Sequence, residues 1–450
     1  MRFRNLANLA VCTLALMLTG CPKASNVAGG NGGADAGHGN SNGGTSGGTA
    51  TAAPKYDGPP DDAAAVKHLQ DRGVALDMDA NGMVNRAVFT TSNEQDIEAL
   101  TKLPRLQRLR LFGPEVTEEW ISKVAKIESL TELTLEKTSM SNDSLVEIAA
   151  LPNLKKLEIP YAAITDEGLK PLVGNKTLKQ LQLLRTNVTA EGVKILAEKK
   201  DWQLLDFRDS QVTDDGLAYL ADMKELKSLK LSSSRLTNDG INHLAGLPNL
   251  KSLSLDLCTD LDNDVIPTIA SLSNLEEAYL YSTKIDDTAL EQLASLPKLR
   301  VLKLRETGVV GEGAEHLAAM KKLTRLDLNE TYYNDDGMGA IGKIETLERL
   351  ELWNTMISGS SFEHIGKLPN LKWLNLDAVQ FSDADLEMLT GLQKLETLIL
   401  NNTQVSDAAV DSLIQLKSLK RLELKFVYGI TDAGRERLKA ELPNLTIVSD

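Results

Sequence analysis

The amino-acid sequence predicts an α/β solenoid, a fold in which short strand–turn–helix units stack side by side. Two observations predict it. The pattern Leu-x-x-Leu-x-Leu recurs fourteen times at a spacing of 24 residues, with one step of 25. At a fixed distance after the triplets comes an apolar residue, then Thr or Ser, acidic residues, a small residue and an apolar pair. The first pattern indicates a strand, and the second indicates the start of a short helix.

The first residues of the chain have the features of an export signal. Arg2 and Arg4 form a basic segment, and an apolar run of ten residues extends from Leu9 to Leu18. Because a membrane-spanning helix needs roughly 20 apolar residues, this run is typical of a signal peptide. We therefore predict that residues 1–20 are a signal peptide.

The predicted signal ends in Leu18-Thr19-Gly20-Cys21. This ending resembles the lipobox of bacterial lipoproteins, whose Cys is diacylated on its thiol and becomes the mature N-terminus. The resemblance implies that Cys21 carries lipid and anchors the chain to the bacterial cell envelope. Pro22 stands where inner-membrane lipoproteins of enteric bacteria have Asp, so the outer membrane is favoured over the inner. The alternative is an ordinary cleaved signal beside a chance cysteine.

Composition limits the partners of the chain. The formal net charge of −14 argues against nucleic acid, because binding to phosphates needs a basic stripe. Of the three cysteines, Cys12 leaves with the signal, Cys21 takes the lipid and Cys258 remains alone. A single thiol cannot form an internal disulfide, so we expect stability to rest on the apolar core.

A tether is predicted for residues 21–60. Ten glycines lie between Gly29 and Gly48 among Asn, Ser, Thr and Ala, and no apolar periodicity is present. This composition is typical of a flexible linker.

Residues 61–102 are predicted to form an N-terminal cap. A short helix can begin at Asp61 or Asp62, because either side chain can accept a free backbone N–H of the first turn. Two strands, at 74–79 and 83–89, are expected to meet in a hairpin at Asn81-Gly82. Such a cap covers the apolar face that the first unit of a solenoid would otherwise expose.

The repeats occupy residues 103–450. Thirty-eight of the 42 triplet positions are Leu, and the other four are Ile159, Trp202, Phe207 and Ala278. Thr followed by acidic residues predicts a helix start, since the hydroxyl can accept a backbone N–H and carboxylates favour the positive helix end. A last strand at 445–448 is expected to close the far end.

The repeat motif, Leu-x-x-Leu-x-Leu-x-x-Thr-x-Ile-Thr-Asp-x-Gly-Leu, resembles that of the leucine-rich-repeat family. The bacterial, helix-bearing subtype akin to the GALA and ribonuclease-inhibitor-like classes is the most similar. The resemblance covers residues 84–450 and implies a right-handed α/β horseshoe with a parallel sheet on the concave face and short helices on the convex face. Where many members have Asn, this chain has Thr or Ser, as at Thr307 and Thr403. We expect these hydroxyls to bond the backbone of the next turn.

Several clusters of potential metal ligands do not form a recognisable site. The segment Asp77-x-Asp79-x-Asn81-Gly82 opens like a calcium loop, but Val88 stands where that loop needs a bidentate acid. The aspartates at 260, 262 and 264 fail in the same way. Three histidines, at 243, 316 and 364, occupy equivalent places in well-separated repeats and cannot share a metal. With no nucleophile or phosphate-loop motif, we predict no catalytic residue, cofactor, metal or enzymatic activity.

The residues that alternate with the core leucines are expected to face the concave side of the sheet. In the later repeats they gather aromatic, basic and polar side chains. Tyr, Trp and Arg dominate binding hot spots, and exposed Trp is costly without a use. The candidate binding residues are Tyr279, Tyr281, Arg305, Asp327, Asn329, Arg349, Glu351, Trp353, Trp373, Asn375 and Asp377. The alternative is that Trp353 and Trp373 only cover the sheet or pack on a neighbouring side-chain stem.

The sequence thus predicts an envelope-anchored protein that binds another protein through its concave face. A glycan- or peptidoglycan-binding surface is the alternative, because aromatic rings beside Asp and Asn can stack on sugars. The membrane is expected to be reached through the lipid anchor only.

Overall fold

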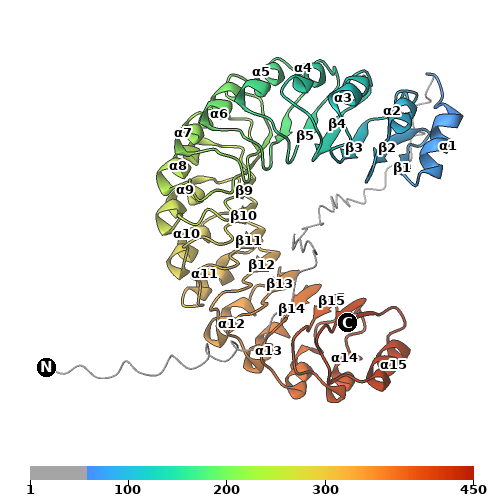
Figure 1. Cartoon of the computed structure of the whole chain (residues 1–450). Coiled ribbons are helices and arrows are strands. Elements are labelled where there is room, and N and C mark those ends of the chain that lie inside the picture. The colour runs from blue at the N-terminus through green and yellow to red at the C-terminus, as the bar shows by residue number, and fades with distance from the viewer. Residues whose placement is uncertain (1–57) are drawn as a thin grey trace, which may run out of the picture. The chain divides into compact units, whose positions relative to one another are not determined.

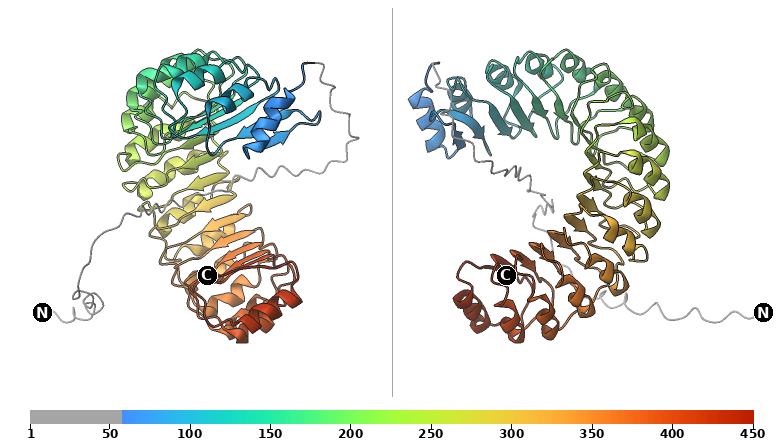
Figure 2. Two further views of the ribbon diagram at one scale, coloured as in Figure 1. Left: turned by 45° about the vertical axis from the view of Figure 1, so that its right-hand side comes forward. Right: turned by 180° about the vertical axis from the view of Figure 1, so that it is seen from behind.

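The computed structural model describes residues 58–450. The predicted signal peptide, Cys21 and nearly all of the predicted tether lie outside the described residues. Seventeen strands form one sheet that does not close on itself. Figure 1 shows the strands on the inner side of a curved ribbon and the helices on its outer side, and the two views in Figure 2 agree. The structure therefore confirms the predicted α/β solenoid.

The strands are short and evenly spaced along the chain. They are β1 (Ala75–Met78), β2 (Val84–Val88), β3 (Arg108–Phe112), β4 (Glu132–Glu136), β5 (Lys156–Glu158), β6 (Gln180–Gln182), β7 (Leu204–Asp206), β8 (Ser228–Lys230), β9 (Ser252–Ser254), β10 (Glu277–Tyr279), β11 (Val301–Lys303), β12 (Arg325–Asp327), β13 (Arg349–Glu351), β14 (Trp373–Asn375), β15 (Thr397–Ile399), β16 (Arg421–Glu423) and β17 (Thr446–Val448).

The helices alternate with the strands and are a mixture of α and 3₁₀ turns. The α-helices are α1 (Ala63–Asp71), α2 (Glu94–Leu100), α3 (Glu118–Val124), α4 (Ser144–Ala149), α5 (Lys170–Val173), α6 (Ala190–Leu196), α7 (Asp214–Ala218), α8 (Asn238–Asn242), α9 (Ile266–Ser271), α10 (Leu290–Leu293), α11 (Ala314–Ala319), α12 (Asp335–Ile341), α13 (Phe362–Ile365), α14 (Val410–Leu413) and α15 (Asp432–Glu441). The 3₁₀ helices are η1 (Asp166–Leu169), η2 (His243–Gly246), η3 (Asn263–Val265), η4 (Asp287–Ala289), η5 (Gly359–Ser361), η6 (Asp383–Leu389) and η7 (Asp407–Ala409).

The leucine spacing sets the register of the sheet. Neighbouring strands pair in parallel with a residue opposite its equivalent 24 positions on, as Leu302 lies opposite Leu326. The single step of 25 leaves the register intact, because Ser252 lies opposite Glu277 and the extra residue falls outside the strands. Cys258 lies in the connection after β9, is buried, and has a pKa that burial raises to about 12. This thiol is therefore part of the core.

The N-terminal segment forms a helix and a hairpin. Asp62 caps α1 by accepting the backbone N–H of Ala65 at 2.8 Å. Strands β1 and β2 are antiparallel, and β2 pairs in parallel with β3, so the sheet continues into this segment. The predicted two-residue turn is wrong: the connection spans residues 79–83, because the Asp79 carboxylate accepts the backbone N–H groups of Asn81 and Met83. This side chain competes with a tight turn for the backbone donors.

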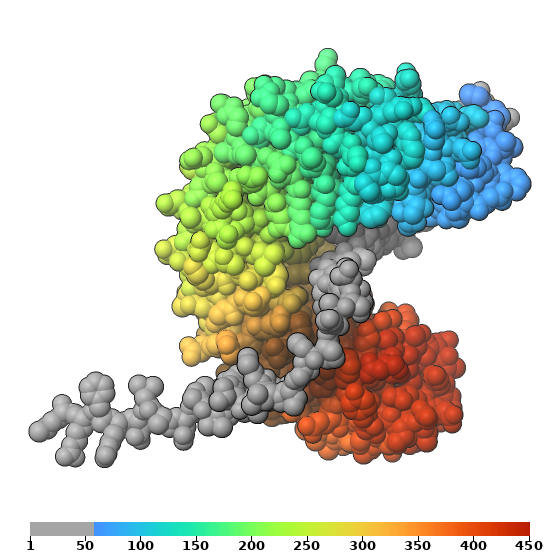
Figure 3. All heavy atoms as spheres, viewed as in Figure 1, coloured from blue at the N-terminus to red at the C-terminus, as the bar shows by residue number. Residues whose placement is uncertain are grey.

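The far end of the sheet is closed by β17, which pairs in parallel with β16, and by α15, the longest helix. Figure 3 shows the outer surface as a continuous series of repeats in chain order. The core inside it is almost wholly aliphatic, and Trp202, Tyr333, Phe89, Phe207 and Phe362 are its largest fully buried side chains.

The Thr and Asp residues at the helix starts join neighbouring repeats. Asp214 accepts both the backbone N–H and the hydroxyl of Thr237, at 3.0 and 2.6 Å, one repeat further on. The same contact recurs for Asp166 with Thr189, Asp335 with Ser358, Asp383 with Ser406 and Asp407 with Thr431. The predicted hydroxyl cap is wrong for Thr237, which accepts no N–H of its own helix within the described chain. Its hydroxyl donates to a carboxylate instead, which is the stronger bond.

The small residue of the helix-start pattern makes room for this contact. A side chain on Gly240 would place its Cβ 2.0 Å from a carboxylate oxygen of Asp214. The glycine at this position is therefore required by the aspartate of the preceding repeat rather than by the backbone of its own helix.

The hydrogen bonds predicted for the Thr hydroxyls that replace the usual Asn also differ from the prediction. Thr307 donates to the carbonyl oxygen of Leu304 at 2.6 Å, and Thr403 donates to that of Leu400 at 2.6 Å. Both bonds lie within one repeat, so the hydroxyl at this position does not bond the backbone of the next turn. Each hydroxyl satisfies a carbonyl group at the end of its own strand.

Candidate binding surface on the concave face

The predicted binding residues lie on five neighbouring strands, β10 to β14, and in the positions directly after them. In each strand the central residue is buried in the core, and its two neighbours point to the concave side. The pairing of the strands brings Lys303 beside Asp327, Asp327 beside Glu351, and Glu351 beside Asn375. The tertiary structure thus gathers the residues between Tyr279 and Asp377 into one patch, which we call the concave patch.

The aromatic rings of the concave patch lie against basic side chains. The Arg305 guanidinium lies 4.9 Å from the centre of the Tyr281 ring and 5.0 Å from that of Trp353. The Arg349 guanidinium lies 4.1 Å from the centre of the Trp373 ring. All three rings are half-buried. The two tryptophans therefore do pack on neighbouring side-chain stems, and these contacts hold their rings in place.

Ion pairs fix the two arginines. Arg305 binds Glu330 through Nε at 2.7 Å and Nη2 at 2.5 Å. Arg349 binds Glu351 through Nε at 2.6 Å, and the second carboxylate oxygen of Glu351 accepts the Asn375 amide at 3.0 Å. Glu351 is buried, so its pairing with Arg349 compensates a charge that would otherwise be costly.

Glu330 is a member of the patch that the sequence patterns did not reveal. It has a φ of 54° and is one of twelve described residues other than Gly in the left-handed region. Such a residue follows the strand in most repeats and turns the chain away from the sheet. This left-handed turn directs Glu330 back toward Arg305. A repeat alignment that included this position could have shown it.

Asn329 and Asp377 have mainly positioning roles. The Asn329 side-chain oxygen accepts the backbone N–H of Trp353 at 2.7 Å. Asp377 accepts the side-chain amide of Asn402 at 2.8 Å. Asn329 is buried, so it supports the patch from below and offers little surface to a ligand.

Asp327 is the least compensated carboxylate of the patch. Burial raises its pKa to about 6 and the nearby Glu351 carboxylate acts in the same direction, whereas Asn329, Lys303 and Arg305 oppose the rise. Within residues 58–450 the Asp327 carboxylate accepts one hydrogen bond, from the backbone N–H of Asn329 at 3.1 Å. A charged group kept under these conditions lowers stability, which is common at functional sites.

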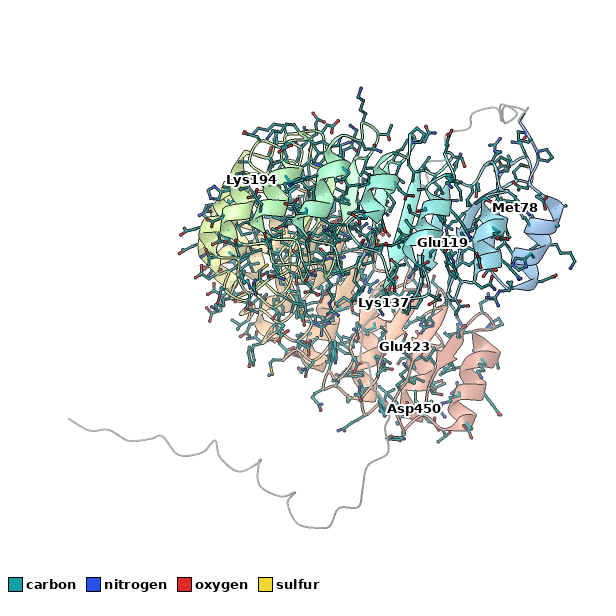
Figure 4. The ribbon with its side chains drawn as sticks, turned by 45° about the horizontal axis from the view of Figure 1, so that its top comes forward. Met78, Glu119, Lys137, Lys194, Glu423 and Asp450 are labelled. Atoms are coloured by element: carbon teal, nitrogen blue, oxygen red, sulfur yellow. The ribbon has the colours of Figure 1, made fainter. Side chains whose placement is uncertain are left out.

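A second group of aromatic and basic side chains lies at the other end of the solenoid, where the sequence patterns did not point. Lys137 lies 5.4 Å from the centre of the Phe112 ring and 5.0 Å from that of Tyr161. Arg185 lies 5.3 Å from the Tyr161 ring and pairs with Asp209 at 2.9 Å. Figure 4 labels Lys137 in this group. These contacts link consecutive repeats along one rim.

The titratable side chains of the described chain are mostly dispersed over its repeats. Within residues 58–450 no group of three or more His, Cys, Asp or Glu side chains could hold a metal ion. His316 and His364 lie on helices beside their neighbours Glu315 and Glu363. One depression of this part of the chain, lined by Asp209, Ser232 and Leu257, is open to solvent. In the same residues no helix is long and apolar enough to cross a membrane.

Comparison with known proteins agrees with this fold. A family model described as Leucine Rich repeat matches residues 150–173. An internalin (inlF) from Listeria monocytogenes is 24% identical over 74% of this chain and 89% of that chain, with a TM-score of 0.52. In the structure of the Rad7 and Elc1 complex in yeast the matched chain is 17% identical, with coverages of 79% and 84% and a TM-score of 0.48. No curated protein sequence matches.

These matches define the class of protein. The chain carries leucine-rich repeats, and its fold is the leucine-rich-repeat solenoid. At such low identities the structural likeness concerns the fold alone, and the fold does not fix a partner.

Proposed function

We propose that this chain is a lipid-anchored protein of the bacterial cell envelope that binds another protein on its concave patch. The observation that carries the proposal is the cluster of Tyr281, Arg305 and Trp353, in which one guanidinium lies between two rings. Aromatic and Arg side chains supply most of the binding energy at protein interfaces. Because the cluster is already held by Glu330, little side-chain entropy would be lost on binding.

A glycan ligand is the second candidate, and the ring contacts make it less favourable. Sugar rings stack on open aromatic faces. In the concave patch Arg349 covers one face of Trp373, and Arg305 lies against both Tyr281 and Trp353. A surface of rings, guanidinium groups and amides suits a protein better than a saccharide.

The concave patch is tested by affinity capture from envelope extract. The full chain is compared with a variant carrying Tyr281→Ala, Trp353→Ala and Trp373→Ala. We expect the variant to lose a protein that the parent retains, with affinity reduced at least about a hundredfold, because hot-spot aromatics each contribute 2 kcal/mol or more. Circular dichroism checks that both are folded.

The matched control removes three exposed aromatics elsewhere, through Tyr219→Ala, Tyr332→Ala and Tyr428→Ala. It should retain the partner. Equal retention by all three proteins would show that the concave patch is not the interface. If none retains a protein but the parent sediments with purified cell wall, the ligand is a glycan and the protein-binding proposal is wrong.

The anchor is a separate proposal, supported by the sequence around Cys21. In a bacterial host, Cys21→Ser should abolish incorporation of a labelled fatty acid and move the protein from the membrane to the soluble fraction of the envelope, since stable binding needs the acyl chains. Cys258→Ser is the control, because its buried thiol should not be acylated. Unchanged labelling of Cys21→Ser would refute lipidation at this residue.

A further inference from the structure

Four strands of the concave face share one local pattern, a basic residue, a Leu and an acidic residue. They are β5 (Lys156 and Glu158), β12 (Arg325 and Asp327), β13 (Arg349 and Glu351) and β16 (Arg421 and Glu423). Residues two apart on a strand point to the same side, so each pattern can form an ion pair within its own strand. The pairs on β5, β13 and β16 are closed, at 2.6, 2.5 and 2.8 Å.

Strand β12 is the exception. Arg325 is exposed, and its side chain makes no hydrogen bond or ion pair within residues 58–450. The Asp327 carboxylate is turned instead to the backbone N–H of Asn329. The chemical difference is one methylene group, because β12 has Asp where the three closed pairs have Glu. The Asp327 carboxylate accepts that N–H and makes no ion pair with Arg325.

The surroundings of Arg325 favour an anion over a cation. On the next strand, Arg349 lies directly opposite Arg325, and Glu351 pairs with Arg349 whereas no carboxylate within residues 58–450 pairs with Arg325. Trp373 lies opposite Arg349, and its indole N–H is buried without a hydrogen-bond partner among the described residues. Arg325 and Arg349 thus place two guanidinium groups side by side on neighbouring strands. A cation approaching Asp327 would meet Arg325, Lys303 and Arg305 around it.

We propose that Arg325 binds an acidic side chain of the protein partner, and that the short side chain of Asp327 keeps this guanidinium available. The inference rests on the proposed protein-binding function of the concave patch and names the charge that the patch recognises. Because the chain as a whole has a net charge of −14, a generic attraction for acidic proteins does not explain such binding. The recognition is local, through one guanidinium.

The test uses a phage-displayed library of short random peptides, selected on the full chain. Peptides selected on the parent should be enriched in Asp and Glu. Their affinity should fall at least about tenfold for Arg325→Gln, since a charge-assisted bond contributes on the order of tenfold or more. Asp327→Glu should cause a similar loss with no change in net charge, because the added methylene lets the acid occupy Arg325 as on β13.

Two further variants make the outcome decisive. Lys156→Gln removes a basic residue of the same pattern outside the concave patch and should leave affinity unchanged. Peptides without acidic residues, an empty selection, or full binding by Arg325→Gln would each overturn the inference. If peptides that Arg325→Gln still binds fully are no longer bound by the Tyr281→Ala, Trp353→Ala, Trp373→Ala variant, the concave patch binds protein but Arg325 does not recognise the partner's charge. If the triple aromatic variant also binds the peptides selected on the parent, the proposed function itself is wrong.

Discussion

Trp202→Ala is expected to lower the free energy of unfolding by about 3–5 kcal/mol, the usual cost of deleting a large buried aromatic side chain. Trp202 takes the place that Leu occupies in the other thirteen triplets, and it is completely buried. Its indole N–H donates to the carbonyl oxygen of Leu196 at 2.9 Å. The Lys199 ammonium, which is also buried, lies 5.4 Å from the ring centre. Truncation therefore removes core packing and exposes a buried charge together.

Urea unfolding followed by circular dichroism measures this effect. Trp202→Leu is the matched control, because it restores the residue of the other repeats. It should cost less than half as much as Trp202→Ala, since most of the core volume is kept. Because each repeat packs only on its neighbours, the alanine variant should also broaden the transition as the solenoid divides near its middle. Equal stability of parent and Trp202→Ala would show that the core around β7 is not packed as described.

Asp327→Asn is expected to raise the free energy of unfolding by about 3 kcal/mol at pH 7.5, because a pKa shift of one unit corresponds to about 1.4 kcal/mol. Burial raises the pKa of Asp327 to about 6 in the folded protein. The native state therefore holds this proton more tightly than the unfolded chain, whose carboxyl has a pKa near 4. This group makes stability fall as the pH rises from about 4 through about 6. An amide keeps the bond from the N–H of Asn329 and carries no charge.

The pH dependence of the stability gain distinguishes removal of the Asp327 charge from other effects of the substitution. Parent and Asp327→Asn should unfold at the same urea concentration at pH 4 and differ at pH 7.5. Asp239→Asn, at an exposed carboxylate of α8, should show no such pH-dependent gain. A stability difference that does not depend on pH would contradict the charge explanation. Asp327→Asn also leaves Arg325 uncovered, so it should keep the affinity for acidic peptides that Asp327→Glu loses.

The repeats and their boundaries were determined by the sequence alone. The register of the sheet follows from the leucine spacing. The leucines of each Leu-x-x-Leu-x-Leu motif must all be buried, and only one pairing of neighbouring strands buries them together. The row of candidate residues from Tyr279 to Asp377 followed from the same periodicity. Local patterns of this kind suffice because a solenoid packs each unit only against its neighbours. Cys21 and its lipid remain sequence-based predictions.

Only the tertiary structure decided how side chains pair between repeats. Asp214 lies in the first turn of its own helix as predicted, and it also binds Thr237 of the next repeat, which the pattern did not indicate. Glu330, itself a left-handed residue, binds Arg305 of the preceding repeat. Arg325 and Arg349 have the same local sequence pattern, yet one is exposed and the other paired. These outcomes depend on the length of one methylene group or on one backbone turn, at contacts between chain segments about 24 residues apart. The periodicity of the sequence does not specify such small differences.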